Sequence, residues 1–174
     1  MKKARWMIAL CLAGVALSVA APSATPPAKV DWPMVSWEAL LPPSQRNAAN
    51  SDPPAPVHDY LEEGGVAATQ NGSFDVNPKL DRSPVRIPGF VVPLDNLPNN
   101  QVREFFLVPY FGACIHVPPP PPNQIVYVKL TAPVTVGSMY DAVWVSGTMH
   151  TEGKSSRLGA SAYTLDAVKV EPYQ

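Results

Sequence analysis

The stretch YDAVWVSGTM, residues 140–149, decides the fold class of this chain. Val143, Val145 and Met149 fall on one face of an extended backbone, and Trp144 falls on the other. This period of two is typical of a β-strand with one buried face. The sequence therefore predicts a half-buried strand here, and a single strand needs neighbours to pair with.

Four other stretches have the β-branched and aromatic composition of strands. They are VRIPGFVVPL (85–94), VREFFLV (102–108), IVYVKLT (125–131) and ASAYTLDAVKV (160–170), with a polar hairpin loop expected at TEGKSSRLG (151–159). Five short strands favour a small barrel or sandwich, and closure into a barrel would protect the strand edges. We predict an all-β fold, a five-stranded OB-like barrel or sandwich, within a single β domain at residues 57–174.

The proline content supports this fold class, because proline interrupts helices. Proline accounts for 22 of the 174 residues, against a usual share of about 5%. Nine prolines fall within residues 21–56, which predicts an extended Pro-rich leader. Inside it, VDWPMVSWEALLPP (30–43) is the exception, with a short helical turn expected from Ser36 to Leu41. This N-terminal arm either packs on the barrel or forms a protein-binding epitope.

The first 20 residues have the pattern of a secretory signal peptide. Three basic residues precede an apolar run from Trp6 to Ala20, which is too short for a membrane span. Cys11 raises the alternative of a lipoprotein, but it follows Leu10 instead of a small residue. We expect cleavage near Ala20 and a soluble periplasmic protein that keeps no transmembrane span.

Cleavage would change both the charge and the cysteine content of the chain. Ten basic residues would remain against 14 acidic ones, a net charge of −4. This sign counts against nucleic acid and anionic lipid as partners. Cys114 would be the only cysteine left, so no internal disulfide could form.

The segment FLVPYFGACIHVPPPPPNQ, residues 106–124, has the most unusual composition. Its five consecutive prolines predict a polyproline II rod that rises about 3.1 Å per residue, roughly 15 Å in all. In an extended chain Cys114 and His116 would point to the same face, in front of this rod.

Thiolate and imidazole together are suitable ligands for Zn²⁺ or Cu⁺. We therefore predict a metal site at Cys114 and His116, with His58 and His150 as further candidate ligands and the carboxylates of the 59–63 segment as oxygen donors. Two alternatives stay open. Cys114 is a small buried side chain beside a hydrogen-bonded histidine, or it is a catalytic or redox thiol activated by His116. For His150, the alternative is an ordinary surface histidine.

The alternative function is that of an adaptor that binds another envelope protein. In this case the polyproline rod is the docking surface, and Cys114 is a packed, structural side chain. The candidate partner-binding residues are Pro118, Pro119, Pro120, Pro121, Pro122, Asn123, Trp32 and Trp37.

The stretches at 85–94 and 106–124 resemble the signature of a bacterial family of unknown function, made up of exported proteins and lipoproteins. The likeness extends from Trp37 to Val170. Members of that family are often encoded beside ABC-type permease components and, in some bacteria, near metal-responsive genes. The resemblance implies a non-enzymatic periplasmic accessory protein of a transport or metal-handling system, with Cys114, His116 and Asn123 in its functional loop.

Overall fold

The computed structural model describes residues 30–46, 70–95, 97–113, 119–137 and 142–173. The predicted signal peptide, both ends of the predicted leader, His58, Cys114, His116 and Pro118 lie outside the described residues. The elements in chain order are α1 (Trp37–Leu40), α2 (Pro43–Arg46), η1 (Pro78–Leu80), β1 (Ser83–Pro93), β2 (Gln101–Val108), η2 (Pro122–Gln124), β3 (Val126–Thr135), β4 (Ala142–His150), β5 (Lys154–Ser156), β6 (Gly159–Ser161) and β7 (Tyr163–Pro172).

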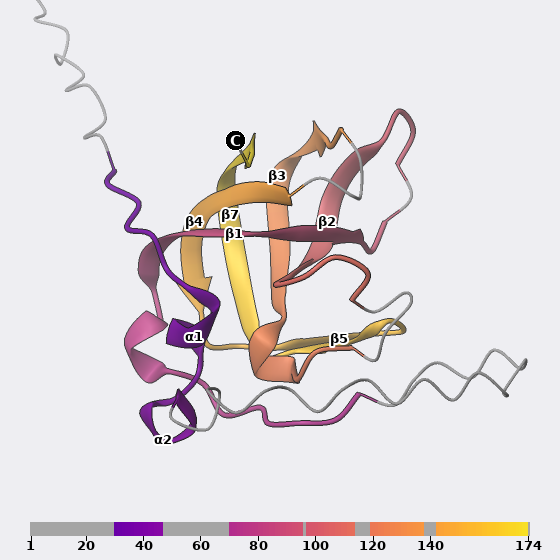
Figure 1. The fold of residues 1–174 in the computed structure, drawn as a ribbon. Coiled ribbons are helices and arrows are strands. Elements are labelled where there is room, and N and C mark those ends of the chain that lie inside the picture. Colours follow the sequence, from indigo (N-terminus) through magenta and orange to yellow (C-terminus); the bar gives the residue numbers. More distant parts are fainter. Residues whose placement is uncertain (1–29, 47–69, 96, 114–118, 138–141, 174) are drawn as a thin grey trace, which may run out of the picture.

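Five of the strands form a closed barrel in the order β1-β2-β3-β7-β4, and β1 pairs with β4 to close it (Figure 1). Every pairing is antiparallel except that of β3 with β7, which is parallel. The predicted all-β fold with a small OB-like barrel is therefore confirmed. The five strands are those expected from the composition, with ends shifted by up to four residues.

The barrel interior is filled by the inward side of each strand. On β4, Val145 and Met149 are fully buried inside the barrel, whereas Trp144 lies on the outer side, as the alternation predicts. The same period on β1 places Val85, Ile87 and Val91 in this core. The barrel is thus a packed core of aliphatic and aromatic side chains.

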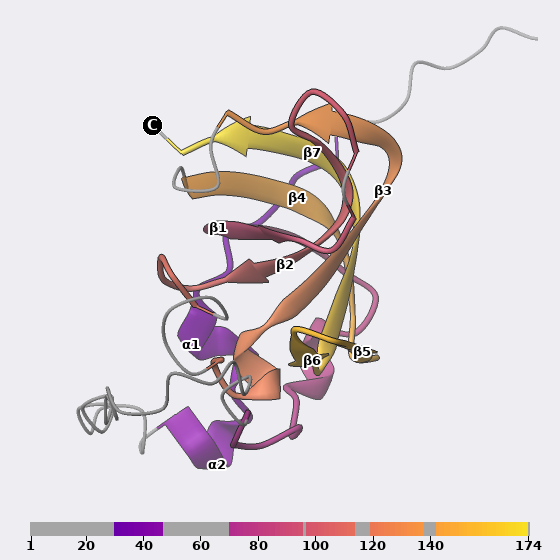
Figure 2. The same ribbon diagram turned by 90° about the vertical axis from the view of Figure 1, so that its right-hand side faces the viewer.

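The prediction for the last strand was wrong in one respect. The stretch 160–170 is interrupted, because the Ala162 amide donates a hydrogen bond of 2.7 Å to the Pro122 carbonyl of η2 instead of to a neighbouring strand. The residues before this break pair with β5, so part of the expected loop at 151–159 is a small two-stranded sheet. Figure 2 shows this hairpin and the helices α1 and α2 on opposite sides, below the barrel strands.

The N-terminal arm lies along β1, where β1 has β4 on one side and has not yet met β2. Met34 pairs with Arg86 in a parallel bridge, in which the Arg86 amide donates to Pro33 and the Arg86 carbonyl accepts from Val35. The Trp37 indole donates a hydrogen bond of 2.7 Å to the Pro88 carbonyl on the same edge. The predicted packing of the arm on the barrel is therefore observed.

Two details explain why β1 tolerates this arrangement. Pro84, Arg86 and Pro88 are alternate residues of β1, so their backbone groups point to the same side of the strand, the side that the arm covers. Proline has no amide proton, and at these two positions the proton would have pointed to the arm and not to β4. Gly89 allows close approach, since a Cβ atom there would lie 3.0 Å from Cζ2 of Trp37 and 2.8 Å from the Val108 carbonyl oxygen. The prolines in this first strand therefore lie on an edge that the arm covers.

Within the described residues, no helix is both long enough and apolar enough to cross a membrane.

The predicted helical turn is present as α1, where the Ser36 hydroxyl caps the helix by accepting from the Ala39 amide.

Candidate functional site

The described parts of the chain between β2 and β3 pack against the outside of the barrel. On β1, β2 and β3, side chains that point away from the barrel interior are buried in a second cluster. This outer-face cluster consists of Val92, Phe106, Val108, Ala113, Ile125 and Tyr127, with Phe90 and Leu94 packed at its margin. Because Ala113 and Ile125 belong to the connection itself, the connection covers a face that a simple barrel would expose to water.

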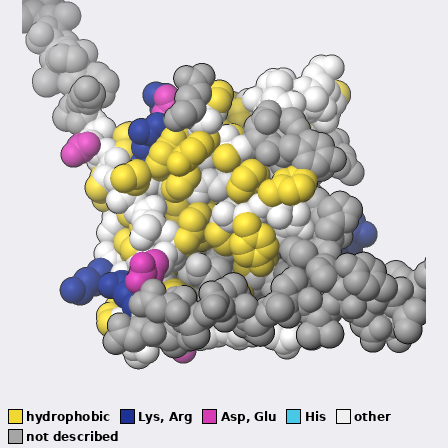
Figure 3. Space-filling view, viewed as in Figure 1, with side chains coloured by type: hydrophobic (Ala, Val, Ile, Leu, Met, Phe, Trp, Pro, Cys, Tyr) yellow, Lys and Arg dark blue, Asp and Glu magenta, His cyan; other side chains and the backbone are white. Residues whose placement is uncertain are grey.

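Ala113 fixes the first end of the Cys-x-His segment. It is 1% exposed within the outer-face cluster, and Cys114 follows it directly. Just before it, Tyr110 and Phe111 are 45% and 48% exposed. The Phe111 ring lies edge-on to Phe90, with 6.1 Å between the ring centroids. Figure 3 shows that apolar side chains gather on the face of the molecule on which α1 and β1 lie.

Four side-chain amides, which we call the amide cluster, fix the other end. They are Gln45, Gln70, Asn123 and Gln124. Asn123 is 1% exposed, and its Nδ2 donates to Oε1 of Gln45 and to the Asp75 carbonyl, both at 3.0 Å. Gln124 donates to the Trp37 carbonyl at 3.1 Å. The residues after the proline run are thereby joined to α1, α2 and the segment before η1.

Gln70 connects the proline run to the β5–β6 hairpin. Its Nε2 donates to the Pro120 carbonyl at 2.9 Å and to the Ala160 carbonyl at 2.8 Å, while its Oε1 accepts from the Ala160 amide at 2.7 Å. The side chain therefore satisfies both backbone groups of Ala160 as a neighbouring strand would. Gly72, at φ +117°, lies against Pro121, where a Cβ atom would come within 2.5 Å of the proline Cβ.

The proline run differs from the predicted rod. Pro122 begins the 3-10 turn η2, so the extended conformation ends before it. Pro120 and Pro122 are buried, Pro119 is half-buried, and Pro121 is exposed. Pro120, Pro122 and Asn123 are buried within the chain, and the partner-binding role of the proline run stays a prediction.

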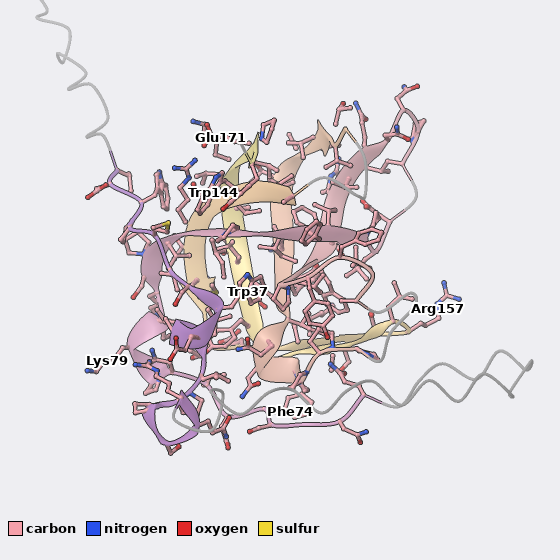
Figure 4. All side chains as sticks on the ribbon, viewed as in Figure 1. Trp37, Phe74, Lys79, Trp144, Arg157 and Glu171 are labelled. Carbon is pink, nitrogen blue, oxygen red and sulfur yellow. The ribbon has the colours of Figure 1, made fainter. Side chains whose placement is uncertain are left out.

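The two tryptophans of the arm are both half-buried. Trp37 packs over Gly89 and bonds to Pro88, so much of its surface is used inside the molecule. Figure 4 shows Trp37 in front of the barrel, near the middle of the face seen in Figure 1.

Tyr127 of β3 joins the outer-face cluster to a set of charged residues. Its ring lies edge-on to Phe106, and the Lys154 ammonium lies 5.8 Å from its centroid. Burial, together with the nearby Glu104 carboxylate, raises the pKa of Tyr127 to about 12. The phenol is therefore a neutral group at physiological pH.

His150 is the one predicted metal ligand that lies among the described residues. Its Nε2 is 3.2 Å from Oδ2 of Asp166, with 29% of the side chain exposed. Asp81 lies nearby and accepts a hydrogen bond from the Thr151 amide, which holds the pKa of the Asp81 carboxyl below its usual value. In the part of the chain that the structure describes, no group of three or more His, Cys, Asp or Glu side chains is arranged to hold a metal ion.

Sequence reasoning missed the amide cluster and singled out only Asn123, as a candidate partner-binding residue and as part of the loop that the resemblance implies. Gln45 lies between Ser44 and Arg46, and Gln70 precedes Asn71, so neither stands out from its polar neighbours and no local periodicity marks them. Their partners are 78 and 90 residues away along the chain. Asn123 itself is part of the cluster, where its side chain bonds to Gln45 and to the Asp75 carbonyl.

Fold and site together define a small OB-like barrel protein in which Ala113 and Ile125, from the described parts of the β2–β3 connection, pack on one outer face. A family model described as "Protein of unknown function (DUF3299)" matches residues 37–172. The chain belongs to this family.

A solved structure from the same family agrees with this assignment. It is a DUF3299 family protein (PA4066) from Pseudomonas aeruginosa PAO1, which is 40% identical to this chain. The match covers 83% of this chain and 98% of that chain, with a TM-score of 0.68. A comparison with curated proteins finds no match. The predicted resemblance to a family of unknown function is confirmed, and the exported nature of the protein stays a prediction.

Proposed function

We propose that this protein is a non-enzymatic periplasmic accessory of a transport or metal-handling system, which binds Zn²⁺ or Cu⁺ through Cys114 and His116. In this proposal His58 and His150 are candidate additional ligands. The observation that supports it best is the anchoring of the chain on both sides of the Cys-x-His segment. Ala113 is buried in the outer-face cluster, and Asn123 is held by the amide cluster.

This anchoring matters because of covalent reach. Five residues join Ala113 to Pro119, and consecutive Cα atoms are about 3.8 Å apart. Cys114 directly follows the buried Ala113, and His116 is three residues from both Ala113 and Pro119. A short connection between fixed ends loses little entropy when its side chains gather around an ion, which favours binding.

The test uses the mature chain from residue 21 onward and competition against chromophoric chelators. We expect Zn²⁺ or Cu⁺ to bind with micromolar or tighter affinity, and Cys114→Ala and His116→Ala each to weaken it by about tenfold or more. His58→Ala and His150→Ala show whether either histidine completes the site. Absence of micromolar binding, or unchanged affinity in Cys114→Ala, would contradict the proposal.

A second candidate is a partner-binding role, with an envelope protein such as an ABC-type transport component as the partner and Cys114 as a packed side chain. It is favoured by the exposure of Tyr110 and Phe111 at the start of the same connection. It predicts that alkylating reagents do not reach Cys114 in the folded protein. Rapid alkylation of the native protein would count against it.

A further inference from the structure

A cavity of about 280 Å³ lies beside the β5–β6 hairpin. One wall comes from the segment before η1 and the other from β5 and the connection of β4 to β5, while the end of β6 and the residue after it complete the lining. The lining residues are Phe74, Val76, Thr151, Gly153, Lys154, Ser155, Ser161 and Ala162. Its volume is close to the lower limit for pockets that bind drug-sized molecules, about 300 Å³, so it suits a small ligand.

The first wall is apolar because the chain alternates there. Ser73 and Asp75 point to one side, where both accept hydrogen bonds from Nε2 of Gln45, at 3.2 and 2.9 Å. Phe74 and Val76 therefore point to the other side, toward the cavity. Phe74 is 61% exposed, a large apolar surface beside a hollow.

The opposite wall presents a cation and hydroxyl groups. Among the described residues that line the cavity, Lys154 is the only charged one, and none carries a carboxylate. None of the ion pairs within the described residues includes Lys154. Its ammonium lies 5.8 Å from the centroid of the Tyr127 ring, an interaction that leaves the charge in place.

We propose that this cavity binds a small carboxylate with an apolar ring or chain. The ammonium of Lys154 would pair with the carboxylate, the hydroxyl group of Ser155 would donate to one of its oxygens, and the apolar part would lie on Phe74. None of the described lining residues is a proposed metal ligand, so this proposal stands or falls independently of the metal proposal.

Three probes separate the charge from the apolar part in a titration of the mature protein followed by amide NMR. Phenylacetate has both features, acetate has only the charge, and benzyl alcohol has only the ring. We expect phenylacetate to shift the amide resonances of residues 74–76 and 153–155, and each of the other two to bind at least fivefold more weakly. Acetate or benzyl alcohol binding as tightly as phenylacetate would overturn the proposal.

Substitutions test the two walls. We expect Lys154→Gln and Phe74→Ala each to weaken phenylacetate binding about fivefold or more. Arg157→Gln and Leu158→Ala are matched controls, because both change exposed residues at the tip of the same hairpin that do not line the cavity. Figure 4 shows Phe74 beneath the hairpin and Arg157 at its outer end. Equal binding by all four variants, with unchanged melting temperatures, would refute the site.

Discussion

At the scale of single residues, buried polar groups determine how the segments outside the barrel attach to it. Tyr163 is fully buried at the start of β7. Its hydroxyl donates to the Leu40 carbonyl at 2.5 Å and accepts from the Asn77 amide at 2.6 Å. One hydroxyl therefore satisfies two backbone groups, one at the end of α1 and one just before η1, which would otherwise be unpaired in the core.

Tyr163→Phe tests this role with almost no change of volume. Removal of the hydroxyl leaves a buried carbonyl and a buried amide without a partner, so we expect the free energy of unfolding to fall by about 3 kcal/mol. Urea denaturation measures the change. Tyr173→Phe is the control, since Tyr173 is 53% exposed, and it should change stability by less than about 0.5 kcal/mol. Equal stability of both variants would show that the Tyr163 hydroxyl is not needed.

At the scale of elements, β1 has to change neighbours along its length. Its first part, up to Phe90, pairs with β4, and its last part, from Phe90 onward, pairs with β2, so one side of the first part is left to the N-terminal arm. Short arms of this kind protect an open strand edge from pairing with other chains. Trp37 contributes both a hydrogen bond and a ring to this cover.

Trp37→Phe should loosen the arm from β1. The substitution removes the hydrogen bond to Pro88 and part of the contact with Gly89, at a cost of about 1–2 kcal/mol. Hydrogen exchange measures it directly, because the amides of Val35 and Arg86 form the bridge and should exchange faster. Trp32→Phe provides the comparison, with an expected cost below about 0.5 kcal/mol. Unchanged exchange at Val35 in Trp37→Phe would mean that the indole does not hold the arm.

The elements differ in how far sequence alone could predict them. The strands were predictable because their pattern is local, as in the alternation of Val143, Trp144 and Val145. The break at Ala162 was not, since it depends on a hydrogen bond to Pro122, 40 residues away. The same holds for the candidate site. The composition of residues 106–124 drew attention to the correct connection, but the amides that anchor it become neighbours only after folding.

At the scale of the whole molecule, burial of phenol groups links stability to alkaline pH. Tyr127 on the outer face and Tyr163 in the barrel both have a raised pKa, in each case chiefly because burial disfavours the phenolate. The unfolded chain would lose these protons near pH 10, the ordinary value for tyrosine. The folded state therefore binds more protons than the unfolded state above that pH, and its stability must fall as the pH rises.

For Tyr127 the window can be stated. Stability from its neutral phenol is fully present below pH 10 and is lost as the pH rises toward the folded pKa of about 12. We expect the free energy of unfolding to decrease across this interval, by on the order of 2 kcal/mol from this group alone. In Tyr127→Phe the decrease should be smaller by that amount, because phenylalanine has no proton to lose. Urea denaturation at several pH values between 9 and 12 measures both slopes. An identical slope in the variant would show that Tyr127 ionises equally in both states, and that the outer face is open to water.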